Sequence, residues 1–244
     1  MPLHFVAEEA SGAQPGARVA LTGAEAHHAA TVRRLRVGEE VTLGDGRGAW
    51  LTGVCTAVSP REVVVEVASR RDVPAPAPRL VLVQALAKGD RDELAVQAAT
   101  ELGVSEIVPW QAARSVSRWG DATKVEKGRL RWETIAREAA KQAHRAWLPE
   151  VGGLATLPAL VARTETARVL VLDPEADAAL SGIRPDDRRD LVFVVGPEGG
   201  IAPEERDALA AAGAEPVRLG DTVLRTSTAG PAALAVANVL LARW

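Results

Sequence analysis

The pattern of hydrophobic and polar positions divides this chain into two parts. Up to residue 73, the apolar residues stand in short runs such as Ala49–Val58 and Arg61–Ala68, and Ser59 and Pro60 separate these two runs. Short strand-like runs at this spacing are typical of a barrel or a compact sandwich. Residues 1–73 are therefore expected to form a small all-β domain, in which the turn-free stretch Glu25–Leu35 is compatible with a helix.

A proline-rich segment, Val73-Pro74-Ala75-Pro76-Ala77-Pro78, follows this part. Proline fixes the backbone angle φ and has no N–H group, so alternating prolines favour an extended, semi-rigid connector. We therefore place a linker at residues 74–78, between a first domain of residues 1–73 and a second domain of residues 79–244.

Strand and helix patterns alternate in the second domain. The runs Leu80–Ala85, Arg168–Leu172 and Leu191–Val195 are continuously apolar, as in strands that are buried on both faces. Shorter strands are expected at Ser105–Pro109 and Pro216–Leu219, and helices at Asp90–Leu102, Val125–Trp147, Pro203–Ala212 and Thr228–Arg243. This alternation predicts an α/β domain with a parallel sheet covered by helices on both faces.

The composition excludes several classes of protein. The 244 residues are 47% apolar and 25% charged with a net charge of −3, which is ordinary globular composition. No apolar run approaches the ~20 residues of a membrane span, and the first residues lack the features of an export signal, so a cytoplasmic protein is expected. Cys55 is the only cysteine and the four histidines lack metal-ligand spacing, so neither a disulfide nor a metal site is expected.

Positive charge is concentrated in one stretch of this mildly acidic chain. Residues 114–145 contain nine basic and four acidic residues, which gives +5 there and leaves −8 for the rest. A local basic surface can bind phosphate backbones. The alternative interpretation is the solvated surface of a long helix.

Two motifs each lie between a predicted apolar strand and the start of a predicted helix. The first, Gly196-Pro197-Glu198-Gly199-Gly200-Ile201, has glycines that let backbone N–H groups approach a ligand at the carboxyl end of a strand. The second runs from Leu219 to Thr228, and its last three residues are hydroxyl-bearing candidates for capping the final helix. Arg225, beside that helix start, is a candidate for holding an anion. The chain has no P-loop motif and no dinucleotide-binding glycine pattern.

These motifs, GPEGGIAPEE and LGDTVLRTSTAGPAAL, resemble those of the SPOUT superfamily of S-adenosylmethionine-dependent RNA methyltransferases. Within it, the match is to the RsmE family, which methylates N3 of a uridine in 16S ribosomal RNA. Its middle signatures are similar to Lys88-Gly89-Asp90-Arg91, Glu101-Leu102-Gly103, Arg114-Ser115 and the spaced residues Glu138, Gln142 and Arg145. His28–Gly38 and Val41–Gly48 resemble its PUA-like barrel, with Arg34 at an arginine position. Ser227, where many members have glutamate, and Arg33, where leucine is usual, depart from the pattern.

The resemblance implies a C-terminal trefoil knot, a homodimer joined through the C-terminal helices, and S-adenosylmethionine held by three loops. Adenine is expected to meet backbone and the apolar side chains of Leu219, Val223 and Leu224. The implied cofactor-binding residues are Leu172, Asp173, Pro174, Val195, Gly196, Pro197, Glu198, Gly199, Gly200, Ile201, Leu219, Gly220, Val223, Leu224, Arg225, Thr226 and Thr228.

The implied reaction moves a methyl group to an imide nitrogen, so the protein must align the reactants and help to remove a proton. Glu198 is a candidate base, and Arg225 is a candidate for stabilising the negative charge that develops on the uracil carbonyls. N3 lies on the Watson–Crick edge, so the target base must be unpaired or extruded. The candidate contacts with 16S ribosomal RNA, expected within the small ribosomal subunit, are Arg34, Arg36, Lys88, Arg91, Arg114, Arg118 and Arg145.

Three other interpretations are weighed against this one. A methyltransferase of the same superfamily acting on another RNA would keep the loops and change the RNA-facing surface. A non-catalytic RNA-binding or ribosome-assembly protein would fail to bind S-adenosylmethionine, and the intact motifs argue against it. A nucleotide hydrolase that uses the glycine loop for phosphate lacks the expected lysine and magnesium ligands.

Overall fold

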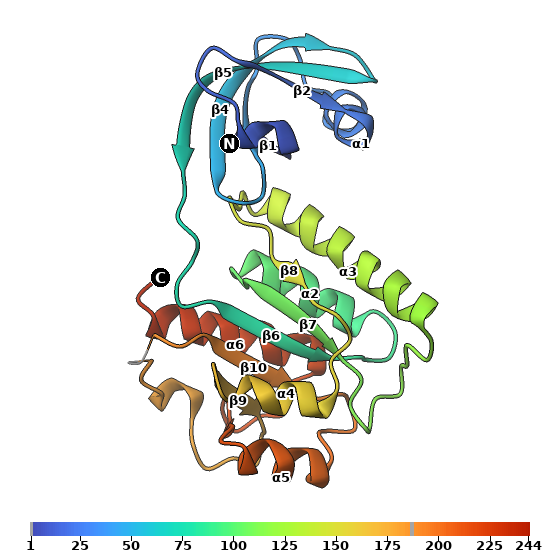
Figure 1. The fold of residues 1–244 in the computed structure, drawn as a ribbon, viewed down its shortest axis with the longest axis vertical. Helices are drawn as coiled ribbons and strands as arrows, with labels where there is room; N and C mark the ends of the chain where they lie inside the picture. Colours follow the sequence, from blue (N-terminus) through green and yellow to red (C-terminus); the bar gives the residue numbers. More distant parts are fainter. Residues whose placement is uncertain (1, 186–187) are drawn as a thin grey trace. The chain divides into compact units, whose positions relative to one another are not determined.

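The computed structural model describes residues 2–185 and 188–244, and the chain forms two compact units. The first consists of Met1–Ala75 and Ala140–Leu148, and the second of Pro76–Ala139 and Pro149–Trp244 (Figure 1). The N-terminal segment of the first unit thus ends at Ala75, inside the predicted linker. Each unit has its own buried apolar core and is described separately.

The first unit is the predicted small β domain. Its five strands form one sheet in the order β1-β3-β4-β5-β2, in which only β1 and β3 pair in parallel. On β5, Val63, Val65 and Val67 alternate into the core, as a half-buried strand requires. The elements are β1 (Leu3–Val6), η1 (Glu8–Ser11), β2 (Arg18–Thr22), α1 (Gly23–His27), η2 (His28–Val32), β3 (Glu40–Gly44), β4 (Ala49–Val58) and β5 (Glu62–Asp72).

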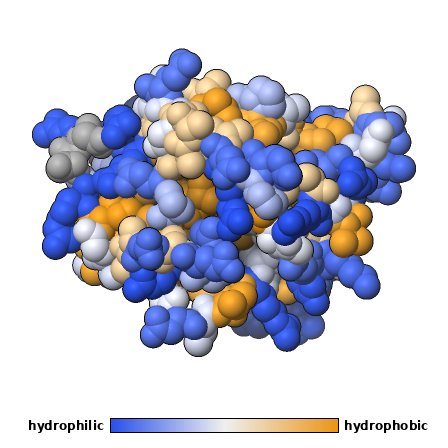
Figure 2. Space-filling view, turned by 90° about the horizontal axis from the view of Figure 1, so that it is seen from below, coloured by the Kyte–Doolittle hydropathy of each residue, from blue (hydrophilic) through white to orange (hydrophobic). Residues whose placement is uncertain are grey.

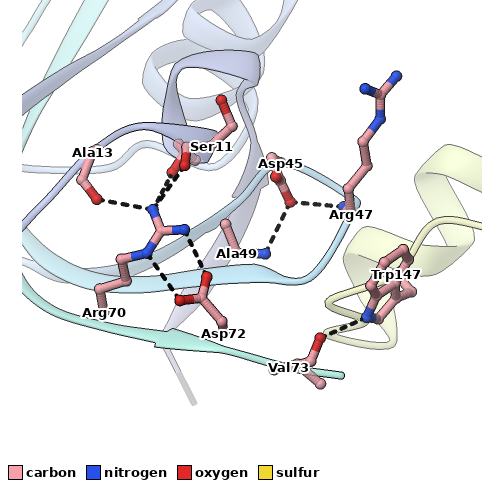
Figure 3. Close-up of polar contacts among 10 residues, drawn as sticks. Ser11, Ala13, Asp45, Arg47, Ala49, Arg70, Asp72, Val73 and Trp147 are labelled. Carbon is pink, nitrogen blue, oxygen red and sulfur yellow. Dashed lines mark hydrogen bonds and ion pairs between the residues drawn. The ribbon is translucent and has the colours of Figure 1, made fainter. Parts of the chain in front are cut away.

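One arginine ties the end of β5 to the beginning of this unit. Arg70 Nη1 donates to the carbonyl oxygens of Ala10, Ser11 and Ala13 at 3.2, 2.9 and 3.0 Å, and Nη2 donates to Asp72 at 2.6 Å (Figure 3). These carbonyls follow or end the short helix η1, where backbone acceptors lack helical partners. The guanidinium therefore supplies donors to three backbone acceptors of this turn.

Replacing Arg70 with alanine is expected to lower the free energy of unfolding by about 2 kcal/mol, because hydrogen bonds from a charged donor to partly buried carbonyls would be lost. Chemical denaturation measures this loss. Arg71→Ala is the matched control, since Arg71 is exposed and lies over the Trp50 ring at 5.3 Å, a contact worth about 0.5–1 kcal/mol. Equal losses in the two variants would contradict the assignment.

The segment 140–148 belongs to the first unit, although the sequence places it in a helix of the second domain. The helix α3 ends at Gln142, and His144 has a φ of 52°, so the helical pattern predicted to run to Trp147 stops early. Trp147 Nε1 donates to Val73 O at 2.9 Å (Figure 3), and Leu148 N–H donates to Gly46 O at 2.9 Å. These contacts join residues about 70 to 100 positions apart, which local periodicity does not register.

The second unit is the predicted α/β domain. Its six strands are all parallel, in the order β11-β9-β10-β6-β7-β8. The strand β8 and the helix α4 were not predicted. The elements are β6 (Leu80–Ala85), α2 (Arg91–Glu101), β7 (Glu106–Trp110), α3 (Ala122–Gln142), β8 (Glu150–Val151), α4 (Leu157–Arg163), β9 (Arg168–Leu172), η3 (Leu180–Gly182), β10 (Leu191–Val195), α5 (Pro203–Ala211), β11 (Glu215–Val217) and α6 (Thr226–Leu240).

Helices cover both faces of this sheet, as predicted (Figure 1). Leu82 and Phe193 lie on one face and pack with apolar residues of α2, α3 and α6. Val83 and Val194, the next residue on each strand, lie on the other face and pack with α4 and α5. Both faces of β6 and β10 are therefore buried, which explains their continuously apolar sequences.

The sheet positions a site at one edge. Because β6, β9, β10 and β11 are parallel, the loops that follow them leave the same edge of the sheet. The predicted trefoil knot stays a prediction. No helix in the described ranges is both long enough and apolar enough to cross a membrane. The face shown in Figure 2 is largely hydrophilic, with apolar atoms in separate patches.

Candidate active-site cavity

A cavity of about 650 Å³ opens at the carboxyl edge of the parallel sheet. Most of its wall is formed by the loops that follow β9, β10 and β11, together with the first turn of α6. The structure brings all the predicted cofactor-binding residues to this wall except Gly199 and Thr228. The two predicted catalytic residues, Arg225 and Glu198, are both on the wall.

Several wall residues were missed as parts of this cavity. Pro203, Thr222 and Ala229 lie inside the two quoted motifs, and the others come from other segments or flank the motifs. Arg91 and Arg114 were expected to contact RNA only, and they follow β6 and β7. The missed residues are Arg91, Arg114, Glu175, Pro203, Arg206, Val217, Thr222 and Ala229.

The loop after β10 folds back on itself, and two of its glycines are needed for this. A Cβ on Gly196 would lie 2.7 Å from Ile201 Cγ1, which is closer than real Cβ atoms come. Gly200 has a φ of 71°, and its N–H donates to Pro197 O at 2.9 Å. A side chain at either position would open the turn.

Glu198 is held by donors from the loop after β6. Its Oε1 accepts from Lys88 N–H at 3.0 Å and from Arg91 Nη1 at 2.7 Å. Burial raises the pKa of the Glu198 carboxyl, but hydrogen bonds from its own backbone, from Arg91 and from Lys88 outweigh burial and hold the pKa below its usual value. A paired carboxylate with a lowered pKa accepts a proton poorly. The contacts favour a role in joining two loops over the predicted role as base.

A buried carboxylate fixes the other side of the same loop. Glu205 Oε1 accepts from Ala113 N–H at 2.8 Å, and Oε2 accepts from Ala202 N–H at 3.1 Å at the start of α5. The neighbouring Arg114 donates from Nη1 to Gly199 O at 3.1 Å. The sequence marks Glu205 only as an acid in the first turn of a helix, and gives no signal of the contact with Ala113.

The opposite wall carries an ion pair. Arg206 Nη1 lies 3.0 Å from Asp173 Oδ2 and 3.6 Å from Glu175 Oε2. The Asp173 hydrogen bond, followed by its charge, raises the pKa of the Arg206 guanidinium. Both wall acids after β9 therefore have a cationic partner, as Glu198 has in Arg91.

Arg225 differs from the other arginines of the wall. It precedes α6 in an extended conformation, and its guanidinium has no hydrogen bond or ion pair within residues 2–185 and 188–244. By contrast, Arg91, Arg114 and Arg206 are all engaged with protein acceptors. Arg225 is therefore a cationic donor of the cavity that is open to a ligand.

The predicted hydroxyl cap of the last helix is wrong. The helix begins at Thr226, and its N-cap residue, Arg225, makes no side-chain capping hydrogen bond within the described residues. The Thr226 hydroxyl instead donates to Gly196 O at 2.9 Å, because the loops after β10 and β11 meet at this point. Among the expected adenine contacts, Leu219 and Leu224 are partly buried, whereas Val223 is 81% exposed and belongs to the rim.

The predicted RNA-binding residues divide between the two units. Arg34 and Arg36 are exposed in the first unit, where Arg145 is half-buried and burial lowers the pKa of its guanidinium to about 10. Lys88, Arg91, Arg114 and Arg118 belong to the second unit, and Arg91 and Arg114 reach the cavity.

Several of the nine cations of the basic stretch are engaged in ion pairs, so fewer than nine can contact a phosphate backbone. Arg129 pairs with both Glu126 and Glu133 along α3. Other pairs are Lys124 with Asp121, Arg131 with Glu93, and the buried Lys141 with Glu25. No cluster of three or more metal-binding side chains occurs in the described part of the chain.

Comparisons with known proteins agree on one family. A family model of an RNA methyltransferase domain matches residues 74–238, and one of an RNA methyltransferase PUA domain matches residues 21–68. Ribosomal RNA small subunit methyltransferase E of Mycobacterium bovis is 46% identical over 234 residues, covering 94% of this chain and 89% of that protein. The protein of that name from Bacillus subtilis is 32% identical, covering 86% of this chain and 85% of its own length.

Two solved methyltransferase structures are also similar to this chain over almost its whole length. The crystal structure of ribosomal RNA small subunit methyltransferase E from Neisseria gonorrhoeae, bound to S-adenosylmethionine, has a TM-score of 0.88 and 29% identity over 98% of both chains. A Legionella pneumophila methyltransferase structure with bound S-adenosylmethionine has a TM-score of 0.86 and 28% identity, again over 98% of both chains.

Proposed function

Because this chain belongs to the ribosomal RNA small subunit methyltransferase E family and is an S-adenosylmethionine-dependent RNA methyltransferase, we propose that it methylates N3 of a uridine in 16S ribosomal RNA. The carrying observation is the cavity at the sheet edge, in which three loops converge and Arg225 is open to a ligand. The reaction takes place in the cytoplasm, on RNA of the small ribosomal subunit.

The cavity fits S-adenosylmethionine in size and chemistry. Its volume of about 650 Å³ lies within the range of roughly 300–1,000 Å³ for small-molecule sites. Leu219 and Leu224 provide apolar surface for the adenine, while Asp173 and the arginines of the rim suit the ribose hydroxyls and the charged amino-acid end. We place the cofactor here, against the residues of the three loops.

The chain must orient the uracil and stabilise the charge that forms as N3 loses its proton. Bound S-adenosylmethionine supplies an electrophilic methyl group on its sulfonium. Arg225 would donate to a uracil carbonyl oxygen and so stabilise the negative charge that develops there as the N3 proton passes to solvent water. Glu198 keeps the glycine loop attached to Lys88 and Arg91, and so positions the reactants.

The target uridine must leave any base pair before N3 can react. Lys88, Arg114 and Arg118 are exposed basic side chains of the second unit, and we propose that they hold the flanking phosphates. We propose that Arg34 and Arg36, which are exposed in the first unit, also contact RNA phosphates. Arg145 contributes less than its sequence position indicates, because it is half-buried.

RNA affinity is expected to fall about tenfold or more between roughly 50 and 200 mM salt, because phosphate contacts release counterions. Arg118→Ala is expected to lower the slope of log affinity against log salt concentration by about 1, the value for one phosphate contact. Arg129→Ala is the control, since Arg129 is already paired with Glu126 and Glu133. Filter binding over a salt series measures both slopes, and a salt-independent affinity would refute the phosphate contacts.

We also propose that the protein acts as a homodimer through α6. Val239 and Trp244, at the end of this helix and just beyond it, are 61% and 65% exposed and so offer apolar surface to a second copy of the chain. Sedimentation equilibrium should give twice the monomer mass. A Val239→Asp variant should shift the equilibrium to the monomer, and a monomeric wild-type protein would end this proposal.

The deciding experiment is methyl transfer from labelled S-adenosylmethionine. Purified protein is incubated with unmodified small ribosomal subunits, free 16S RNA or transfer RNA, and the RNA is digested for nucleoside mass analysis. Label in 3-methyluridine from small-subunit RNA supports the proposal. Label in another nucleoside or another RNA would identify a different substrate and overturn the proposed one. Cofactor binding without transfer to any of these RNAs refutes the proposed substrate.

A further inference from the structure

A buried glutamine reaches the cavity wall from the strand beneath it. Gln84 is 0% exposed and is the second-last residue of β6, the strand between β10 and β7. Its Nε2 donates to Thr226 Oγ1 at 2.9 Å and to Ala85 O at 3.2 Å. Thr226 in turn donates to Gly196 O at 2.9 Å. One continuous chain of hydrogen bonds therefore joins β6, the start of α6 and the glycine loop.

The direction of this chain is fixed by the number of available protons. The Thr226 hydroxyl has one hydrogen, and Gly196 O is an acceptor only, so Thr226 must accept its other hydrogen bond. Gln84 supplies that donor with its amide nitrogen. Its Oε1 is consequently left buried with no hydrogen-bond partner among residues 2–185 and 188–244, an arrangement that costs free energy. Such an orphan in a native fold needs an explanation.

We propose that Gln84 is a positioning residue of the cofactor cavity, which orients the Thr226 hydroxyl and thereby locks the glycine loop to the loop that ends in Arg225. Thr226 lines the cavity and directly follows Arg225, and Gly196 begins the turn that contains Glu198. The orphaned oxygen is the consequence of presenting the nitrogen to Thr226. The inference rests on the proposed placement of the cofactor in this cavity.

Gln84→Glu tests the direction of the donor. The protonated carboxyl can donate to Thr226 as the amide does, whereas the carboxylate can only accept and would draw the Thr226 proton away from Gly196 O. Calorimetry with S-adenosylhomocysteine, the product of methyl transfer, measures ligand binding to the cavity without any methyl transfer. The dissociation constant of the variant, relative to wild type, is expected to rise about tenfold between pH 6 and pH 8.5. A relative affinity that is independent of pH would overturn the proposal.

Gln97→Glu is the matched control, because Gln97 is exposed on α2 and its variant should keep a constant ratio to wild type. If Gln84→Glu fails to fold, two variants of Thr226 test the same hydrogen bond. Thr226→Ser keeps the hydroxyl and should bind within about threefold of wild type, whereas Thr226→Val should bind about tenfold more weakly. Equal affinities for the Ser and Val variants would overturn the role of the hydroxyl.

A cavity variant separates this inference from the placement of the cofactor. Leu219→Glu puts a charge on the apolar wall and should weaken S-adenosylhomocysteine binding at least tenfold. If Leu219→Glu weakens S-adenosylhomocysteine binding while the relative affinity of Gln84→Glu does not change with pH, the positioning role of Gln84 is refuted and the placement of the cofactor stands. Unchanged binding by Leu219→Glu refutes the placement of the cofactor.

Discussion

Arg225→Ala is expected to lower kcat for methyl transfer by about 10²–10³-fold, the usual effect of removing one donor to a developing oxyanion. The guanidinium has no protein partner in the described ranges, so the variant leaves no buried acceptor unsatisfied. The dissociation constant of S-adenosylmethionine should change less than about threefold, because the apolar wall and the loop backbones remain. Single-turnover kinetics and calorimetry measure the two quantities separately.

The control is Arg61→Ala, which removes an exposed arginine from the turn between β4 and β5 and should leave kcat unchanged. Arg225→Lys keeps the charge but loses the planar fork, so it should recover part of the rate. A parallel rise in the dissociation constant of the cofactor would assign Arg225 to cofactor binding. An unchanged kcat would remove it from the reaction.

The local part of this site was predictable from the sequence. The apolar strands ending at Leu172 and Val195, and the glycines that follow Val195, specify where a chain can turn and expose its backbone. Parallel strand order then brings those ends to one edge. For this reason the predicted loops lie on one cavity, and Arg225 lies with them.

The long-range ties were not predictable, because no local pattern reports which side chains meet after folding. The contacts of Glu205 with Ala113 and of Gln84 with Thr226 join residues 92 and 142 positions apart. Thr226 shows the consequence: its position suggests a helix cap, but its hydroxyl finds an acceptor on another loop. Likewise, the sequence alone gives no partner for the Glu198 carboxylate, and only the folded structure places Arg91 against it.

Acid is expected to destabilise the first unit through His4. This side chain is 6% exposed, stacks on Trp50 with ring centroids 4.4 Å apart, and has Nδ1 2.9 Å from Thr42 Oγ1. Thr42 donates to Leu3 O, so it accepts from Nδ1–H. His4 Nε2 is buried and has no hydrogen-bond partner in the described part of the chain. A proton added to Nε2 would therefore have no acceptor.

Burial, followed by the positive charges of His144 and Lys141, lowers the pKa of His4 to about 4. The unfolded chain has an ordinary histidine pKa of about 6.5. Between these values the unfolded state binds a proton that the folded state does not, so stability falls as pH falls from about 6.5 to about 4. The contribution of His4 to this loss is about 3 kcal/mol, at about 1.4 kcal/mol for each pKa unit.

His4→Phe keeps an aromatic ring against Trp50 and removes the titrating group. Its unfolding free energy should therefore lose about 3 kcal/mol less than that of the wild type between pH 7 and pH 4, as measured by chemical denaturation. Carboxylates titrate in the same range, but they are common to both proteins and cancel in the comparison. His27→Gln, which removes an exposed imidazole, should keep the wild-type dependence. If His4→Phe also keeps it, the neutral buried imidazole is not the source of the acid sensitivity.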